Sequence, residues 1–202
     1  MMNIKATICF FFLIVSAFAQ IDTTLFIKVH FLYGSKPKKK FKATEIKYFG
    51  GIHGGHVSIQ VGNMDYGFEP TDKVHIFPHK NNHKAGYVSN ITKGAMRYDT
   101  SSKVTTFIIP LTIEQYNKLN IINQTYCKKT PYDYAFFGMR CASTAQDVLG
   151  QIGVVKKKSR FSNIVTTFYP KKLRKRLFKL AIKNNYIVIK SSGRFSRKWE
   201  KD

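Results

Sequence analysis

The chain has few cysteines and few acidic residues. Its 202 residues include 3 cysteines and 11 Asp and Glu against 34 Lys and Arg, which gives a formal net charge of +23. So few cysteines exclude a small scaffold held together by disulfides. The excess of positive charge attracts acidic polymers and anionic membrane surfaces, but it does not specify a fold. A lysine-rich, solvated surface gives the same count, so charge alone does not select a function.

Long hydrophobic runs are also absent after Gln20. Residues 1–19 combine Lys5, the apolar run ATICFFFLIVSAF and a small-x-small AFA ending, which is the pattern of a secretory signal peptide. The apolar run is too short to span a bilayer comfortably. We therefore expect an exported protein, periplasmic or secreted, whose residues 20–202 form a single domain and a monomer.

Hydrophobic periodicity divides the chain into strands and helices. Alternating stretches predict five strands: 24–33 (TLFIKVHFLY), 56–61 (HVSIQV), its hairpin partner 66–70 (YGFEP), 72–78 (DKVHIFP) and 103–111 (KVTTFIIPL). A polar loop separates the last two strands. Helical spacing follows in 112–127, in 141–153 and in the basic 169–185, before a strand at 186–190 and a loose tail at 191–202. This order predicts an α+β fold with an antiparallel sheet packed against helices.

Only Cys127 and Cys141 remain once the signal peptide is removed. A thiol is a strong nucleophile as the thiolate, and a helix N-terminus lowers its pKa. The pattern places Cys141 at the start of a helix and Cys127 at the end of one. In an oxidising compartment the two cysteines can instead form a disulfide, and that alternative stays open.

His56 opens a predicted strand, and Glu69 lies in the hairpin partner of that strand. A hairpin that folds about Asn63 returns Glu69 to the neighbourhood of His56. An imidazole can share the proton of a thiol, and a polar group at its second nitrogen fixes the tautomer. Glu69 is our candidate for that group, and the nearby alternatives are Gln60, Asp65 and His75.

The other histidines receive simpler interpretations. His53 lies in a Gly-rich turn, and we interpret it as a surface residue. His75, His79 and His83 recur every four residues, as metal ligands on a helix would. Pro78 prevents a regular helix there, so the three histidines do not share one face. We expect no metal and no cofactor.

Two segments resemble a known family. GGHVSIQVG with YGFEP, followed by PYDYAFFGMRCASTAQDVL, is similar to the circularly permuted papain-like group of the NlpC/P60 superfamily of cysteine hydrolases, which includes YiiX-like and lecithin:retinol acyltransferase-like proteins. The likeness covers about residues 50–153, and the AST after Cys141 departs from the Ser-Glu common in YiiX-like members. It implies a papain-like fold and a Cys-His-Glu site. In that site Cys141 is the nucleophile, His56 the base and Glu69 the orienting residue. The resemblance also places Tyr132 or Tyr134 near the thiol, and the Cys141 backbone N–H in an oxyanion hole.

The resemblance and the export signal together predict an exported cysteine hydrolase. We expect an amidase or peptidase that cleaves cell-wall peptides, such as those of peptidoglycan, through a thioester. Hydrolysis or transfer of acyl esters is an alternative reaction. A different class of function is a binding protein without catalysis, whose basic face holds an acidic glycan or anionic lipid. Nucleic acid is not an expected partner, because no array of aromatic residues is interleaved with the basic ones.

Overall fold

The structure is a computed structural model, and it describes residues 25–47, 54–70, 74–79, 86–91 and 101–202. The predicted signal peptide at 1–19 and both His53 and His83 lie outside these residues. No helix in the described ranges is both long and apolar enough to cross a membrane.

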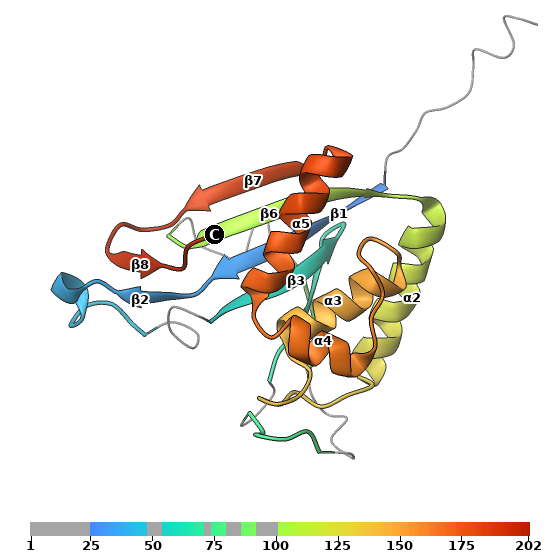
Figure 1. The fold of residues 1–202 in the computed structure, drawn as a ribbon, viewed down its shortest axis with the longest axis horizontal. Helices are drawn as coiled ribbons and strands as arrows, with labels where there is room; N and C mark the ends of the chain where they lie inside the picture. The colour runs from blue at the N-terminus through green and yellow to red at the C-terminus, as the bar shows by residue number, and fades with distance from the viewer. Residues whose placement is uncertain (1–24, 48–53, 71–73, 80–85, 92–100) are drawn as a thin grey trace, which may run out of the picture.

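A six-stranded antiparallel sheet forms the centre of the molecule (Figure 1). The strand order is β5-β4-β3-β1-β6-β7. The strands are β1 (Leu25–Tyr33), β3 (Gly55–Val61), β4 (Met64–Phe68), β5 (Tyr87–Ile91), β6 (Lys103–Leu111) and β7 (Ile187–Ser192). A second, two-stranded sheet pairs β2 (Ser35–Pro37) with β8 (Arg197–Trp199), and a 3-10 turn, η1 (Lys39–Phe41), follows β2.

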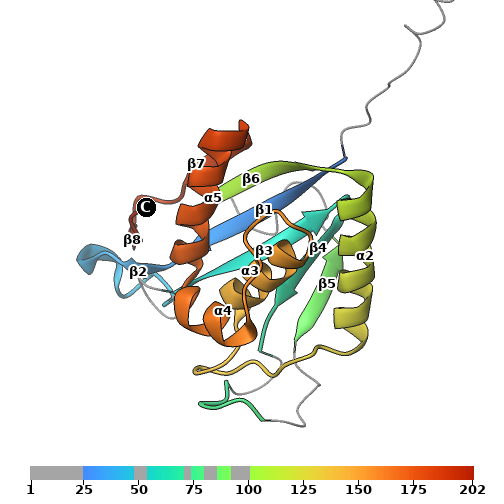
Figure 2. The ribbon, with the colours of Figure 1, turned by 45° about the vertical axis from the view of Figure 1, so that its right-hand side comes forward.

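The four α-helices of the described residues lie on one face of the large sheet (Figures 1 and 2). They are α2 (Ile113–Lys128), α3 (Cys141–Gln151), α4 (Arg160–Thr166) and α5 (Pro170–Asn184). Helix α2 begins where Thr112 and Gln115 cap each other reciprocally, a complete capping box. The architecture confirms an α+β class with an antiparallel sheet and helices.

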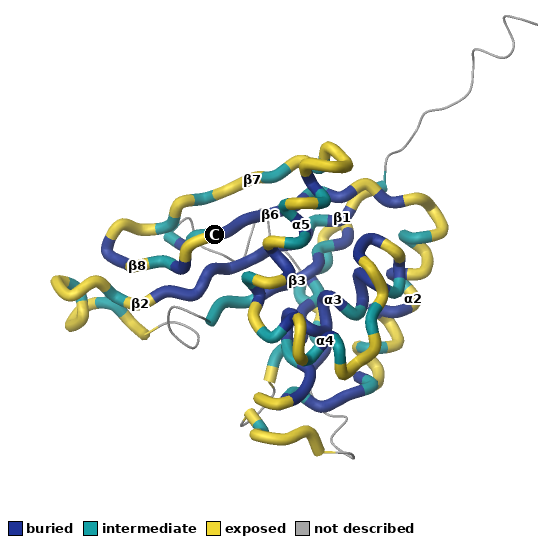
Figure 3. Tube along the Cα trace, viewed as in Figure 1, coloured by how far each residue is buried: buried dark blue, intermediate teal, exposed yellow. Residues whose placement is uncertain are grey.

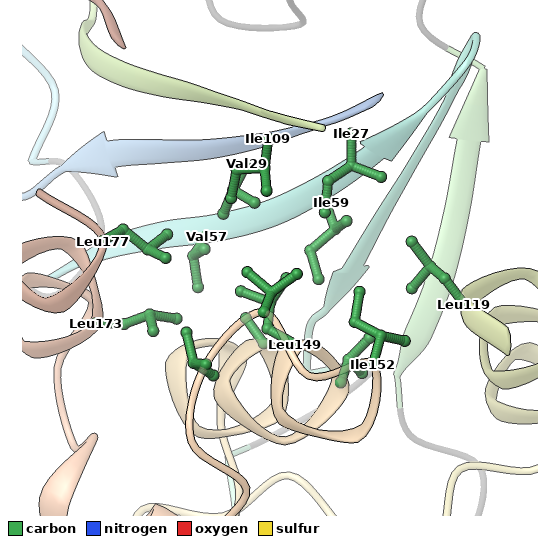
Figure 4. Packing of buried hydrophobic residues seen from close by; sticks show 14 of the residues in the cluster. Ile27, Val29, Val57, Ile59, Ile109, Leu119, Leu149, Ile152, Leu173 and Leu177 are labelled. Carbon is green, nitrogen blue, oxygen red and sulfur yellow. The ribbon is translucent and has the colours of Figure 1, made fainter. Parts of the chain in front are cut away.

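The hydrophobic core fills the space between the sheet and the helices (Figure 4). Alternate residues of β1, β3 and β6 point into it, because successive strand side chains face opposite sides. Helix α3 is buried along nearly its whole length, whereas α2 and α5 each bury one side (Figure 3). The central core residues include Ile27, Val29, Val57, Ile59, Ile109, Leu119, Leu149, Leu173 and Leu177. This packing fixes the N-terminus of α3 against the sheet.

Several local predictions were wrong. Residues 74–78 form no regular strand, and His75 makes only an isolated bridge to Ala135. β5 lies in the stretch that we expected to be a polar loop, and α4 was not predicted at all. Both are short, and α4 is only 7 residues long, so neither carries a clear periodic pattern.

The C-terminal tail is anchored, contrary to the prediction of a loose end. β8 pairs with β2, and the Glu200 N–H donates to the Gly34 carbonyl at 2.8 Å. The fully buried Arg174 of α5 pairs with Glu200 and with Asp202, each at 3.2 Å. Its guanidinium also lies 3.7 Å from the centre of the Tyr33 ring. The acidic end of the tail thus neutralises a buried cation, which the charge pattern of the sequence did not indicate.

Candidate active site

The β3–β4 hairpin places Glu69 beside His56. The ladder runs from Val61↔Met64 to Ser58↔Gly67, across a turn at residues 62 and 63. Continued by two pairs, this register sets Glu69 opposite His56. Their side chains do meet, with His56 Nε2 3.7 Å from Glu69 Oε1. The predicted neighbourhood of the two residues is therefore present in the structure.

Two glycines lie around His56 at positions where a side chain would not fit well. Gly55 has a φ of +104°, and a Cβ there would collide with the Leu32 carbonyl oxygen, so only glycine fits where β3 begins against β1. A Cβ at Gly67 would lie 3.0 Å from His56 Nε2 and 3.7 Å from Glu69 Oε1. The absent side chain at Gly67 therefore leaves the space that the imidazole occupies next to Glu69.

Cys141 reaches His56 because the edge of β3 is open there. β1 stays paired with β3 as far as Gly55, whereas β4 leaves the ladder at Gly67. Cys141 is the first residue of α3, as predicted. The N-terminus of α3 meets this open edge, where the Val57 backbone N–H and the His56 side chain both hydrogen-bond to the Cys141 thiol. The thiol thus lies at the positive end of a helix and in contact with an imidazole.

The protonation of the pair favours a thiolate and an imidazolium. Burial raises the pKa of Cys141, but the hydrogen bond and the charge of His56, the Val57 N–H and the charge of Arg140 together bring that pKa below its usual value. Burial lowers the pKa of His56, yet its hydrogen bond with Cys141 and the charges of Cys141 and Glu69 raise it overall. The opposite shifts favour the charged forms of both groups over the neutral pair.

Of the two tyrosines, only Tyr134 has its hydroxyl at the thiol. That hydroxyl lies within hydrogen-bond reach of the Cys141 thiol and of the Cys141 backbone N–H. Burial and the nearby cysteine raise the pKa of Tyr134, so the hydroxyl is protonated and able to donate. Tyr132 is in the core, and its hydroxyl donates to Asp147 at 3.4 Å. The structure therefore does not bring the Tyr132 hydroxyl to the site.

The alternatives for the third residue have other partners. Gln60 accepts a hydrogen bond from His30 Nε2 at 2.9 Å and donates to the Gly62 carbonyl. Asp65 lies opposite Gln60 in the ladder, nearer the turn than Gly67, although its charge also helps to raise the pKa of His56. His75 Nδ1 is 2.7 Å from Asp133 Oδ2. Glu69 is thus the member of this set whose side chain meets His56.

His75 and His79 contact Asp133 and each other. His75 contacts Asp133 and stacks on His79 with ring centres 4.0 Å apart. The His79 backbone N–H also donates to Asp133, which ties residues 74–79 to the loop that precedes α3. Within the described ranges, no three His, Cys, Asp or Glu residues are grouped as a metal would require.

Arg140, which directly precedes the thiol, is a site residue that was not predicted. Its guanidinium lies 3.2 Å from the centre of the Phe168 ring, and its charge contributes to the lowered pKa of Cys141. Ser143 fixes the backbone at this helix start, because its hydroxyl accepts from the Arg140 N–H at 2.7 Å. The sequence shows a basic residue next to the cysteine, but it does not show that the guanidinium packs on Phe168.

Both cysteines in the described residues, Cys127 and Cys141, are free thiols, so the structure does not support a disulfide between them. Cys127 is exposed at the end of α2, and burial of its neighbourhood raises its pKa. Cys141 is buried, with its pKa shifted the other way. The two thiols of one chain therefore differ in both exposure and ionisation.

Comparisons with known proteins give no relative for this chain. No protein-family model, no curated protein and no solved structure matches it.

Proposed function

We propose that the protein is a cysteine hydrolase of the permuted papain-like type, with Cys141 as nucleophile, His56 as acid and base, and Glu69 as the residue that orients His56. The observation that carries the proposal is the contact between the Cys141 thiol and the His56 imidazole at the start of α3, with opposite pKa shifts. A structural cysteine in a core needs neither an imidazole partner nor a lowered pKa. A nucleophilic cysteine needs both.

The reaction begins with the thiolate–imidazolium pair. The Cys141 sulfur attacks the carbonyl carbon, and the carbonyl oxygen takes the negative charge. Collapse of this intermediate breaks the C–N bond, and His56 gives its proton to the leaving amine. Neutral His56 then takes a proton from water, whose oxygen attacks the thioester carbon. Cleavage of the C–S bond releases the acid and restores the thiolate.

The oxyanion is stabilised by donors at the start of α3. The Cys141 backbone N–H lies beside the thiol and points toward the Tyr134 hydroxyl. A substrate oxygen placed between them receives the N–H and the protonated Tyr134 O–H as two donors. Phe68 supports this position, because its ring lies 5.1 Å from that of Tyr134. We assign the binding role to Tyr134 and not to Tyr132.

The proposed substrate is a cell-wall peptide, cleaved at an amide bond outside the cytoplasm. The predicted signal peptide favours export, and the net charge of +23 favours binding to an acidic wall polymer or membrane surface. The test is incubation with soluble peptidoglycan fragments, followed by quantification of new amino groups and mass spectrometry of the products. New amino groups support the amidase, whereas retention of the fragments on the protein without turnover supports the binding-protein alternative.

An acyl-ester substrate is the alternative for the same site. Three exposed phenylalanines lie beside the loop that carries Arg140: Phe77 and Phe137 stack at 5.4 Å, and Phe136 contacts Phe137 at 4.9 Å. Such a surface accepts an apolar acyl chain. Cleavage of long-chain esters without release of amino groups from wall fragments would favour this reaction over the amidase.

Replacing Glu69 by glutamine is expected to narrow the pH range of activity. The rate rises with pH as the Cys141 thiolate forms and falls as the His56 imidazolium loses its proton. The Glu69 charge helps to raise the pKa of His56, so its removal moves the alkaline limb to lower pH. Because Glu69 is 44% exposed, the loss at the optimum is about fivefold or less. The measurement is the pH profile of kcat/KM. An unchanged alkaline limb would contradict the role of Glu69 as the residue that acts on His56.

A further inference from the structure

Arg140 is held in an aromatic cage immediately before the proposed nucleophile. Its guanidinium carbon lies 3.2 Å from the centre of the Phe168 ring, 5.8 Å from that of Phe136 and 5.9 Å from that of Tyr169. These rings come from two loops, one before α3 and one between α4 and α5. Stacking on rings fixes the plane of a guanidinium, but it leaves the N–H donors in that plane unsatisfied.

One edge of this guanidinium has no hydrogen-bond partner among the described residues. Its Nε and Nη2 atoms are both buried and unpaired there. These two nitrogens lie on the same side of the group, and together they form the fork that binds a carboxylate through two parallel hydrogen bonds. Buried donors without a partner are costly, so this edge is a candidate for a group supplied by a ligand.

The two buried arginines of the described residues have carboxylates of their own. Arg174 pairs with Glu200 and Asp202, and Arg197 pairs with Glu45 at 2.8 Å. No ion pair links Arg140 to an acidic residue in the described ranges. The half-buried Arg176 also lacks a carboxylate, but its guanidinium donates to Gln146 and Thr167. Arg140 differs in that one edge of its guanidinium is unpaired among the described residues, next to Cys141, and its charge acts on that thiol.

We propose that Arg140 binds a carboxylate on the acyl part of the substrate, close to the carbonyl that Cys141 attacks. The inference rests on the proposed function, and it narrows the substrate class to acyl groups that carry a negative charge near the scissile bond. Arg140 then selects the substrate, and its aromatic cage keeps the fork in one orientation before binding.

Two alkylating agents of nearly equal size test the proposal without a known substrate. Iodoacetate and iodoacetamide both transfer a two-carbon group to a thiolate with loss of iodide, but only iodoacetate carries a carboxylate. The rates are measured by mass spectrometry on the peptide that contains Cys141. The ratio of the two rates cancels any change in the amount of thiolate, because both reagents need it equally.

We expect Arg140→Gln to lower the iodoacetate-to-iodoacetamide ratio at Cys141 by roughly 10- to 100-fold. Arg140→Lys keeps the charge but loses the paired donors. Its ratio should therefore lie between those of the wild type and of Arg140→Gln. Arg160→Gln is the matched control, because Arg160 is exposed and its loss changes the net charge equally. The control should leave the ratio unchanged.

The outcomes separate this inference from the proposed function. A ratio that Arg140→Gln leaves unchanged, with normal iodoacetamide reactivity at Cys141, would overturn the carboxylate site and leave the nucleophile intact. A lysine variant with the full wild-type ratio would overturn the role of the paired donors. A Cys141 that iodoacetamide does not modify would refute the proposed function, and with it the inference.

Discussion

Alanine at position 141 is expected to lower the rate of amide hydrolysis by about 10⁴-fold or more. The variant lacks the sulfur that forms the thioester, and neither His56 nor Glu69 can replace it. Cys141 is only 6% exposed, but alanine fits the start of a helix well. The free energy of unfolding should therefore change by only about 1 kcal/mol. Hydrolysis and urea denaturation are measured on the same preparation.

Cys127→Ala is the matched control for that variant. It removes the thiol of Cys127, which is exposed at the end of α2. Its hydrolysis rate should equal that of the wild type. Wild-type activity in Cys141→Ala, or loss of activity in Cys127→Ala alone, would contradict the assignment of the nucleophile.

The largest loss of stability is expected for Arg174→Ala. Arg174 is completely buried in α5, and it neutralises the buried Glu200 and the half-exposed Asp202. Removal of one partner from a buried ion pair leaves an unpaired charge and costs about 3–5 kcal/mol. The lost packing on the Tyr33 ring adds to this effect. Urea denaturation followed by circular dichroism measures the change in the free energy of unfolding.

Lys175→Ala is the control on the same helix, because Lys175 is the exposed neighbour of Arg174. It should change the free energy of unfolding by less than about 0.5 kcal/mol. A second variant, Arg174→Met with Glu200→Gln, removes both charges and should recover part of the loss. If Arg174→Ala were as stable as Lys175→Ala, the tail would not depend on this ion pair.

The pairing of His56 with Glu69 was predictable because a hairpin is a local structure. A two-residue turn at Gly62 and Asn63 determines the register, and the register determines which residues face each other. The start of α3 at Cys141 was also predictable, since the apolar residues that follow it repeat at helical spacing. The antiparallel sheet and the long helices were also predicted from local spacing of apolar residues, and the structure confirms them.

Features that depend on long-range packing were not predictable. Tyr132 and Tyr134 lie in the same short segment, and only the core contact of Tyr132 with Asp147 separates their roles. The aromatic cage of Arg140 requires Phe168, which is distant in the sequence. The tail seemed loose because its polar composition resembles a disordered end, yet its acids pair with the buried Arg174. In each case the partner lies on another element.

The most direct test of the activated thiol is a competition between Cys141 and Cys127 in the same molecule. Iodoacetamide is added in limiting amount at neutral pH, and mass spectrometry measures the modification of the Cys141 and Cys127 peptides. The pKa of Cys141 is lowered and that of Cys127 is raised, so we predict that the buried Cys141 reacts faster than the exposed Cys127. In His56→Ala this order should reverse. Faster modification of Cys127 in the wild type, with a Cys141 rate that His56→Ala leaves unchanged, would contradict a catalytic Cys141–His56 pair.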